Sequence, residues 1–393
     1  MRRSSVAFLF VSSFGLALLP SAHAAAVKKV RSTTTCSILD YGAVADNSTD
    51  IYDALGSAWT ECVKPAVTDS AEDTILYVPS GAYALKTAIT FGDASTFTFK
   101  IDGDIQIPFN GDLAGNLFFF DDCESIILSG SGSVNGNGYY YREGGDLTLY
   151  PNRPRLFRFQ NCNNCDISGV TLINSPMFHM TVIGDNNVVH DQVVVADDIG
   201  ETDAYDISGD NNYVHDVEVT NGDECVTVKS PTNGFLAENI ICHYSAGCNI
   251  GSFGVGGAAA VENVYYRNVT LYDSDAGVMI KAYPDSTGYV KNATYVDFTV
   301  SAVAYPIDID EYWCSDCPTA NGTLSVSDIT FDGFSGTGDD TTTRPLIKLD
   351  CLPDYICEDI TFEDIDLTKE GGVTVANIID NACGTGLSGL DAC

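Results

Sequence analysis

Two stretches of this chain follow one pattern: Asn-Asn-Val-Val-His-Asp-Gln-Val-Val-Val at residues 186–195 and Asn-Asn-Tyr-Val-His-Asp-Val-Glu-Val-Thr at residues 211–220. Each begins with an asparagine pair and ends in a short β-branched run, which is typical of a corner followed by a strand. Asn and Gly tolerate left-handed backbone conformations, and similar corners stand at residues 163–164 and 233–234. The pattern therefore predicts short strands separated by sharp corners that recur once per repeat.

The repeat extends through most of the chain. Segments of the form polar, aliphatic or Phe, any, apolar each supply one apolar anchor, and the anchors are 23, 24, 23, 29, 29, 36 and 31 residues apart. The anchors are Val170, Val193, Val217, Ile240, Val269, Phe298, Phe334 and Ile365. A drifting period of this size indicates a solenoid in which each coil buries its inward residues on the next.

We therefore predict an all-β chain, a single-stranded right-handed parallel β-helix. A β-sandwich has similar short strands but does not need a periodic anchor, so it ranks second. A doubly wound α/β fold ranks lower because helical patterns are missing between the strands.

One helix is expected near the N-terminus, from about Asp50 to Cys62, with Ser48 or Thr49 as its N-cap. Its apolar face comprises Ile51, Ala54, Leu55, Ala58, Trp59 and Cys62. A solenoid exposes its first coil, and this short helix would cap it. Cys36 is placed to pin the first strand to the helix through Cys62.

The first 24 residues have the features of a secretory signal peptide. Arg2 and Arg3 precede an apolar run from Val6 to Leu19, and the small-residue pattern ending at Ala24 predicts cleavage after that residue. The apolar run is short for a membrane span. We therefore expect residues 25–393 to form a single catalytic β-helix domain that is secreted to the extracellular space, without a membrane anchor.

The composition supports export and excludes one class of partner. Losing the two arginines of the signal peptide moves the formal charge from -35 to -37. Because nucleic-acid binding needs the opposite sign, we exclude it.

The 14 cysteines favour disulfides, since an even count in an exported chain is more naturally disulfide than metal or redox chemistry. Close pairs predict local staples: Cys314 with Cys317, Cys351 with Cys357, and Cys383 with Cys393. Four sequons predict N-glycosylation, at Asn47, Asn268, Asn292 and Asn321.

The richest chemistry lies between residues 201 and 252. Asp203 precedes Asp223 and Glu224 by about one coil, and residues one coil apart stack about 4.8 Å from each other. Neighbouring carboxyl groups split their pKa values, which leaves one protonated and another ionised. A protonated acid beside an ionised base is the equipment of glycoside hydrolysis.

Most of the 54 acidic residues are expected to be solvated surface or turn residues. We assign Asp206 and Asp210 to that class, and Asp197 and Asp198 to a loop rather than a site. His179, His190 and His215 lie in or beside strand patterns, so we expect them to be structural.

Several segments resemble the pectin-degrading hydrolases of glycoside hydrolase family 28. They are residues 203–206, 221–230 and 250–254, together with 136–138 and 39–43, where 39–43 is similar to the strand that opens the family's fold. The resemblance covers essentially the whole mature chain.

Three departures from the polygalacturonases of that family are specific. The Asp-Asp pair is Asp223 and Glu224 here, the Gly-His-Gly place reads Ser-Ala-Gly at 245–247, and the Arg-Ile-Lys place reads Met-Ile-Lys at 279–281. The same departures are familiar in the rhamnogalacturonase branch, which segments 223–231 and 308–313 also resemble. The resemblance therefore points to that branch.

The resemblance implies a role for each carboxyl group. Asp223 would be the general acid that protonates the departing glycosidic oxygen, and Asp203 with Glu224 would position and deprotonate a water. It also implies inversion at the anomeric carbon, for which an acid and a base lie roughly 6.5–9.5 Å apart.

Substrate contacts are expected from Lys281, as a point charge for a uronate carboxylate, and from Lys229, for which a solvated strand end is an equal alternative. Tyr312 or Trp313 could stack on a sugar ring, and burial is an equal alternative. We expect no cofactor and no metal.

The leading hypothesis is a monomeric hydrolase of the galacturonic acid to rhamnose linkages in the rhamnogalacturonan backbone of pectin. The alternatives are a galacturonan or exo-acting pectin hydrolase, and a β-helix that binds pectin without cutting it.

Overall fold

The computed structural model describes residues 32–393 except 69–71, 94, 255 and 315–321. Residues 32–393 form one compact unit. The predicted signal peptide, Cys317 and Asn321 lie outside the described residues. Among the described helices, none has the length and apolar character needed to cross a membrane.

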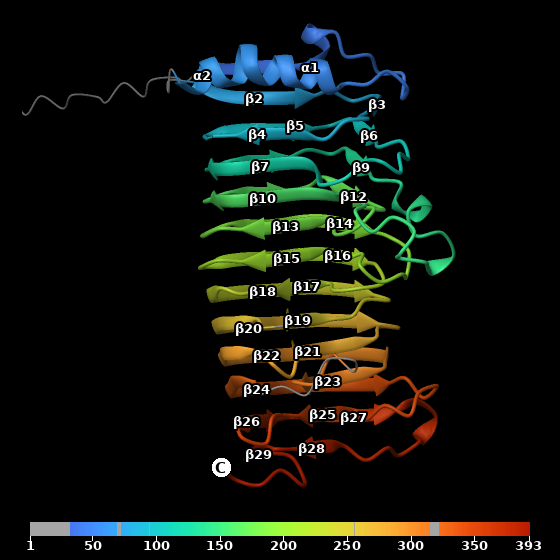
Figure 1. Ribbon diagram of the computed structural model, residues 1–393, viewed down its shortest axis with the longest axis vertical. Coiled ribbons are helices and arrows are strands. Elements are labelled where there is room, and N and C mark those ends of the chain that lie inside the picture. The colour runs from blue at the N-terminus through green and yellow to red at the C-terminus, as the bar shows by residue number, and fades with distance from the viewer. Residues whose placement is uncertain (1–31, 69–71, 94, 255, 315–321) are drawn as a thin grey trace, which may run out of the picture. The chain divides into compact units, whose positions relative to one another are not determined.

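The strands run in parallel through successive coils, which stack in chain order from the N-terminal helix to the last strand (Figure 1). One sheet has 11 strands, one from each coil in turn: β4 (Ile89–Gly92), β7 (Asn116–Glu124), β10 (Arg155–Asn163), β13 (Met180–Ile183), β15 (Tyr205–Ser208), β17 (Val226–Val228), β19 (Cys248–Phe253), β21 (Ala276–Ala282), β23 (Tyr305–Asp310), β25 (Ile347–Asp350) and β28 (Ile378–Asp380).

The second sheet has 18 strands, several of which bend around the coil: β1 (Ser32–Ser37), β2 (Glu72–Val78), β3 (Ala82–Ala84), β5 (Phe97–Ile101), β6 (Asp104–Gln106), β8 (Ile127–Ser129), β9 (Ser133–Asn135), β11 (Asp166–Ser168), β12 (Thr171–Ile173), β14 (Val188–Val195), β16 (Asn212–Thr220), β18 (Thr232–His243), β20 (Ala258–Tyr272), β22 (Thr287–Val303), β24 (Thr323–Gly338), β26 (Cys357–Glu363), β27 (Asp366–Lys369) and β29 (Ala382–Thr385). The predicted class, an all-β parallel β-helix, is confirmed.

The anchor column is confirmed along most of its length. The register pairs Val217 with Ile240, then Val269, Phe298 and Phe334, one residue per coil. Rings in neighbouring coils stack in the same way, and the centroids of Phe298 and Phe334 lie 4.6 Å apart. Each coil therefore buries its inward residues on the next, as the repeat predicted.

One anchor was wrong. Gln192, not Val193, pairs with Val217, and Val193 is 40% exposed whereas Gln192 is 1% exposed. The Gln192 amide donates to the Val170 carbonyl at 3.2 Å and accepts from the Tyr205 hydroxyl at 3.4 Å. A polar residue can therefore occupy the column because its amide is satisfied there, which a search for apolar anchors misses.

The asparagine corners are confirmed, and they do more than turn the chain. Asn186 and Asn211 have φ values of 57° and 56°. The second asparagine of the pair, Asn187, is buried; its amide accepts from the Cys165 N–H at 2.9 Å and donates to the Cys162 carbonyl at 2.9 Å. This side chain therefore satisfies the backbone of the preceding coil at a place where the ladder is interrupted.

The N-terminal helix is longer than expected and begins later. It consists of α1 (Tyr52–Ser57), a π-helical turn (Ala58–Val63) and α2 (Lys64–Thr68). The N-cap prediction was wrong, because Ser48 and Thr49 donate their backbone N–H groups to Asp46, outside the helix. The predicted apolar face is confirmed, since Ile51, Ala54, Leu55, Ala58 and Trp59 are buried and Cys62 is half-buried against the same core.

The segment 39–43 is not a strand. It lies in and just after a 3-10 helix (Ile38–Tyr41) that ends at Gly42, where φ is 89°. The strand that opens the fold is instead β1, which pairs with β2. Short 3-10 helices also occupy Gly138–Tyr140, Glu143–Gly145 and Glu370–Gly372.

Five disulfides occur among the described residues. Three of the four predicted pairs are confirmed: Cys36–Cys62, Cys351–Cys357 and Cys383–Cys393. The fourth, Cys314 with Cys317, stays a prediction because Cys317 lies outside the described residues. Two others were not predicted: Cys123–Cys162 and Cys225–Cys242. Cys165 and Cys248 are buried free thiols, so the even cysteine count did not mean complete pairing.

The sequon residues Asn47, Asn268 and Asn292 are exposed, and their glycosylation stays a prediction.

The buried corner amide yields a stability prediction. Asn187→Ala leaves the Cys165 N–H and the Cys162 carbonyl without this partner, so we expect a loss of about 2 kcal/mol or more in the free energy of unfolding. Denaturant unfolding measures it. Asn152→Ala, at an exposed loop position, is the control and should change little; equal effects of the two variants would contradict the role of the corner amide.

Candidate active site

Three carboxyl groups meet where two neighbouring coils enter the 11-stranded sheet. Asp203 lies just before β15, and Asp223 with Glu224 just before β17. The Ala204 N–H donates to the Glu224 carbonyl at 2.9 Å, which places Asp203 and Glu224 at the same level of the two coils. One oxygen from each of the three carboxyl groups lies within 4.8 Å of the others. The predicted cluster therefore exists in the structure.

The three groups differ in their access to solvent. Asp203 and Glu224 are buried, whereas Asp223 is half-buried and lines a cleft of about 390 Å³. The other residues lining this cleft are Asp198, Gly200, Gly222, Ala246, Asp275, Met279, Lys281, Tyr305, Asp308, Asp310, Trp313 and Arg344. Asp223 is therefore the member of the cluster that faces the cleft.

The environment separates the pKa values of the three groups. Burial, together with the neighbouring Glu224, raises the pKa of Asp223 well above its usual value. Burial and the Glu224 charge also raise the pKa of Asp203. Burial alone would raise the pKa of Glu224, but hydrogen bonding to Asp223 and the ammonium groups of Lys281 and Lys229 outweigh it and hold that pKa well below its usual value. The cluster thus combines protonated acids with one ionised carboxylate.

Lys281 provides the principal positive charge. It is buried in β21, forms an ion pair with Glu224, and its Nζ lies 5.0 Å from the Trp313 ring centroid. The three carboxylate oxygens lie close enough to hold a cation, but this ammonium already neutralises Glu224. Lys281 also lines the cleft, as its predicted role requires.

Asp206 was wrongly assigned to the solvated surface. It is buried in β15, and its carboxylate lies 3.1 Å from the Lys229 ammonium. The Lys229 Nζ also lies 3.9 Å from Glu224 and donates to the Gly251 carbonyl at 2.8 Å. Lys229 is therefore held by partners within the protein. Asp206 pairs in register with Thr227 of the next coil, and no local pattern of the sequence indicates that its carboxyl group is buried.

The other minor expectations have mixed outcomes. Asp210 is exposed, as expected. Asp197 and Asp198 do lie in a loop, but Asp198 lines the cleft. Trp313 also lines the cleft and is 42% exposed, whereas the Tyr312 side chain does not belong to its lining. Of the two aromatic candidates, Trp313 is therefore the one placed to meet a sugar ring.

Sequence reasoning missed Arg344 and a group of buried charges at one side of the cleft. The Arg344 guanidinium lies 4.3 Å from the Tyr305 ring centroid, and both residues line the cleft. Lys348 is paired with Asp310 and lies 3.9 Å from Asp308, and both of these aspartates line the cleft. Burial raises the pKa of Asp308 to about 7. The alternation of acidic residues along β23 was the available signal.

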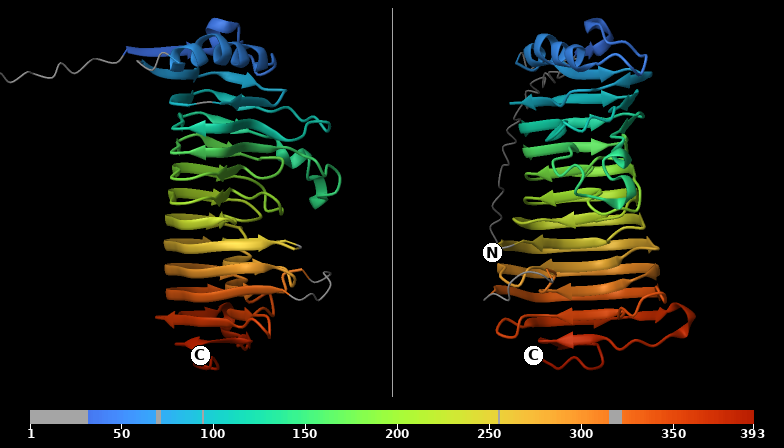
Figure 2. Two further views of the ribbon diagram at one scale, coloured as in Figure 1. Left: turned by 60° about the vertical axis from the view of Figure 1, so that its left-hand side comes forward. Right: turned by 45° about the vertical axis from the view of Figure 1, so that its right-hand side comes forward.

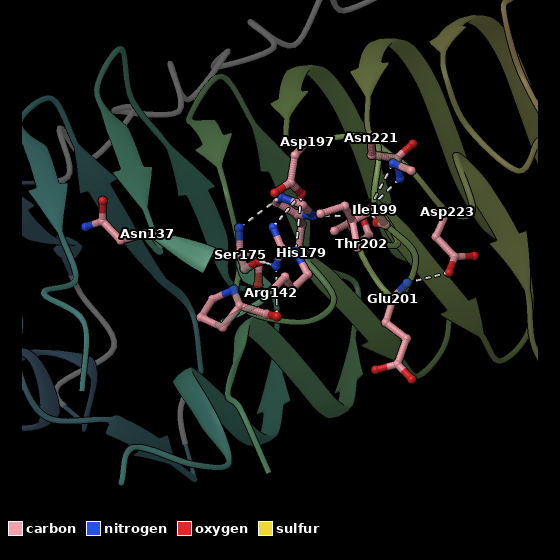
Figure 3. A network of polar contacts seen from close by, with 12 residues as sticks. Asn137, Arg142, Ser175, His179, Asp197, Ile199, Glu201, Thr202, Asn221 and Asp223 are labelled. Carbon is pink, nitrogen blue, oxygen red and sulfur yellow. Dashed lines mark hydrogen bonds and ion pairs between the residues drawn. The ribbon is translucent and has the colours of Figure 1, made fainter. Parts of the chain in front are cut away.

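His179 lies directly behind the cluster. It is fully buried, and burial lowers its pKa to about 4, so the ring is neutral at ordinary pH. Its Nε2 accepts from the Ser175 N–H at 3.1 Å, which leaves Nδ1 to donate to the carbonyls of Thr202 at 3.1 Å and Asp203 at 3.2 Å (Figure 3). Its expected structural role is consistent with these contacts.

The spacing of the carboxyl groups differs from the expectation. Inverting hydrolases commonly separate acid and base by roughly 6.5–9.5 Å, but the three carboxyl oxygens here lie within 4.8 Å of one another. The cause is in the chain: Asp223 and Glu224 are adjacent, and Asp203 is one coil away. One coil of rise therefore supplies less separation than the usual range requires.

Comparisons with known proteins agree with this geometry. The model of the family "Glycosyl hydrolases family 28" matches residues 70–385. The chain is 37% identical over 373 residues to a probable rhamnogalacturonase A of Aspergillus niger, covering 94% of this chain and 78% of that one. It is 36% identical over 358 residues to rhamnogalacturonase A of Aspergillus aculeatus, covering 90% and 77%.

Solved structures show the same fold. An endo-xylogalacturonan hydrolase from Aspergillus tubingensis matches with a TM-score of 0.76 and 25% identity, over 91% of this chain and all of that one. A polygalacturonase from Erwinia carotovora matches with a TM-score of 0.68 and 18% identity, over 90% and 97%. The family model and the curated relatives together confirm the resemblance seen in the sequence: this chain belongs to glycosyl hydrolases family 28 and is a glycoside hydrolase.

Proposed function

We propose that this enzyme hydrolyses galacturonic acid to rhamnose linkages in the rhamnogalacturonan backbone of pectin. Identity of 36–37% to rhamnogalacturonases over nine-tenths of the chain carries the choice of substrate. Ala246 and Met279 line the cleft at two of the three places where the chain departs from polygalacturonases, so the departures lie where they can affect substrate choice. We also propose that the enzyme acts outside the cell and as a monomer.

In the proposed reaction, Asp223 protonates the departing glycosidic oxygen. It faces the cleft, and its raised pKa keeps a proton available. Glu224 accepts the proton of the attacking water, because its lowered pKa keeps it ionised. Asp203 orients that water, since its own pKa is raised and its buried Oδ1 has no partner among the described residues. The step conserves the number of protons on the cluster but leaves Asp223 ionised and Glu224 protonated, so the two groups return to their starting states by proton exchange with solvent before the next turnover.

Two cationic side chains in the cleft can bind the carboxylate group of a uronate. Lys281 has three N–H donors, of which the ion pair with Glu224 needs one, and Arg344 presents a planar fork suited to a carboxylate. Trp313 offers a face for a sugar ring. These local charges matter because the chain as a whole is strongly acidic and repels an acidic polymer over about 8 Å at physiological salt.

The substrate is tested by incubating the protein with rhamnogalacturonan, homogalacturonan and xylogalacturonan and following chain length and reducing ends. We expect cleavage of rhamnogalacturonan, with kcat/KM at least tenfold above the value for the other two. Cleavage confined to homogalacturonan or xylogalacturonan would refute the choice of substrate. Proton NMR of the first product, read before mutarotation, should show inversion at the anomeric carbon despite the close carboxyl groups.

The role of the acid is tested by Asp223→Asn. Asparagine keeps the shape but has one acceptor oxygen, so it can keep one of the two backbone hydrogen bonds that Asp223 accepts on its two oxygens, and it cannot give a proton to the glycosidic oxygen. We therefore expect kcat to fall by about 10² to 10⁴-fold while the protein stays folded. Asp210→Asn, at an exposed turn, is the matched control and should keep the native kcat. A fully active Asp223→Asn protein would remove Asp223 from the mechanism.

The charge of Lys281 sets the acid limb of the pH profile. Lys281→Met removes this ammonium, which lowers the pKa of Glu224 in the native protein. The effect of burial is then less opposed, so the pKa of Glu224 rises. The base works only when ionised, so activity would be lost at a higher pH as the pH falls, and the acid limb of kcat/KM should move upward. Lys291→Met, which breaks an exposed pair with Glu262, is the control and should leave the limb in place. An unmoved acid limb in Lys281→Met would mean that Glu224 is not the base.

A further inference from the structure

Two arginines are buried outside the catalytic cluster. Both belong to the segment 138–154, which leaves the coil between β9 and β10 and projects from its side (Figures 1 and 2). Arg142 has no exposed surface and Arg153 is 3% exposed. A buried guanidinium is costly unless it is paired and hydrogen-bonded, so its partners are informative.

Arg142 joins two parts of the chain. Its Nε and Nη2 donate to Asp197 at 3.2 and 2.8 Å, and its Nη1 donates to the carbonyls of Ser175 and Pro176 at 2.5 and 2.9 Å (Figure 3). Gly138 makes room for this guanidinium, since a Cβ there would lie 2.6 Å from Nη1. All three nitrogens of the guanidinium are therefore hydrogen-bonded, and Gly138 packs against Nη1.

Arg153 reaches the same loop four residues further along. It forms an ion pair with Glu201, and its Nη1 donates to the carbonyls of Leu147 and Tyr150 within its own segment at 2.8 and 3.2 Å. Tyr150 in turn packs edge-on against Phe109, with 5.4 Å between the ring centroids. The projecting segment is thus anchored to the coil, and it binds the first and the last residue of the loop 197–201.

The loop 197–201 contacts the acid directly. The Glu201 N–H donates to Oδ2 of Asp223 at 2.6 Å (Figure 3), and Glu201 adopts a left-handed φ of 58°. Gly222, next to Asp223, packs so tightly that a Cβ would lie 2.2 Å from the Asp198 carbonyl carbon. Small movements of the loop would therefore reach the Asp223 carboxyl.

We propose that Arg142–Asp197 and Arg153–Glu201 form a clamp that holds the backbone of residues 197–201 against Asp223 and thereby orients its carboxyl group. This inference rests on the proposed function, because it assigns the clamp to the general acid of that reaction. Arg142, Arg153, Asp197 and Glu201 are positioning residues: each acts through the Glu201 N–H.

The clamp has a consequence for the pH profile. A backbone N–H favours the ionised form of the carboxylate that accepts from it, so the Glu201 N–H opposes the rise that burial gives the pKa of Asp223. When the loop loosens, that pKa rises further. The general acid works while protonated, so activity would persist to a higher pH and the alkaline limb would move upward, whereas the misplaced acid would lower kcat.

The test compares Asp197→Asn, Glu201→Gln and the double variant with Glu262→Gln, which breaks an exposed ion pair with Lys291 and serves as the matched control. On rhamnogalacturonan, we expect the double variant to move the alkaline limb of kcat/KM upward by about one pH unit. Its kcat should fall about tenfold or more with little change in KM. Each single variant should show part of both effects, and the control neither.

Circular dichroism and thermal unfolding establish that each variant is folded. Folded single and double variants with the native alkaline limb and kcat would overturn the proposal. Should Asp197→Asn fail to fold because Arg142 loses its partner, Glu201→Gln decides alone, since the Glu201 side chain is 44% exposed.

Hydrogen exchange provides a readout that needs no turnover. The amides of residues 197–203 should exchange faster in the double variant than in the native protein or the control, and equal exchange would overturn the clamp. If the native protein cleaves none of the three pectic substrates, the proposed function fails. The exchange data would then still show whether the clamp holds the loop.

Discussion

Each coil of this protein hydrogen-bonds in parallel register to the next, and this stacking sets residues one coil apart about 4.8 Å from each other. The same register that stacks Phe298 on Phe334 in the core also brings Asp203 to the level of Glu224 at the edge of the sheet. Apolar side chains gain from that proximity, whereas like charges are penalised by it. The fold therefore fixes the carboxyl groups at close range, and their surroundings must accommodate the repulsion.

The repulsion is reduced because the three carboxyl groups have different surroundings. Lys281 is paired with Glu224 and lies beside no other member of the cluster at ion-pair distance among the described residues, so one carboxylate is stabilised while burial keeps its neighbours protonated. Asp206 and Lys229 extend the same arrangement along the next column of the sheet. A row of buried charges on a rigid ladder thus becomes a set of groups with different protonation states, which general acid and base catalysis requires.

The sequence predicted those parts of the molecule that recur in every coil. The anchor column and the asparagine corners could be read because each coil repeats one constraint, and the cluster followed because its members are one coil apart. Gln192 was not predicted as an anchor because it is polar, and only its satisfied amide allows it to be buried in the core. The burial of Asp206 was not predicted because a buried charge depends on its partner, here Lys229, and no local pattern indicates that pair.

The remaining parts could not be read because they arise where the repeat is broken. Arg142 is separated by 55 residues from Asp197, and Arg344 approaches the cleft from a loop between two coils. Such contacts follow no period, since the segments that make them vary in length from coil to coil. A rigid solenoid can place acids and bases on its ladder, but the ladder alone offers only its own spacing. Finer control over the position of a carboxyl group must come from segments outside the coil, and the projecting segment 138–154 contacts the loop beside Asp223 with two buried cations. In this fold, therefore, the coils determine which reaction groups meet, and the insertions between coils determine how accurately each group is held.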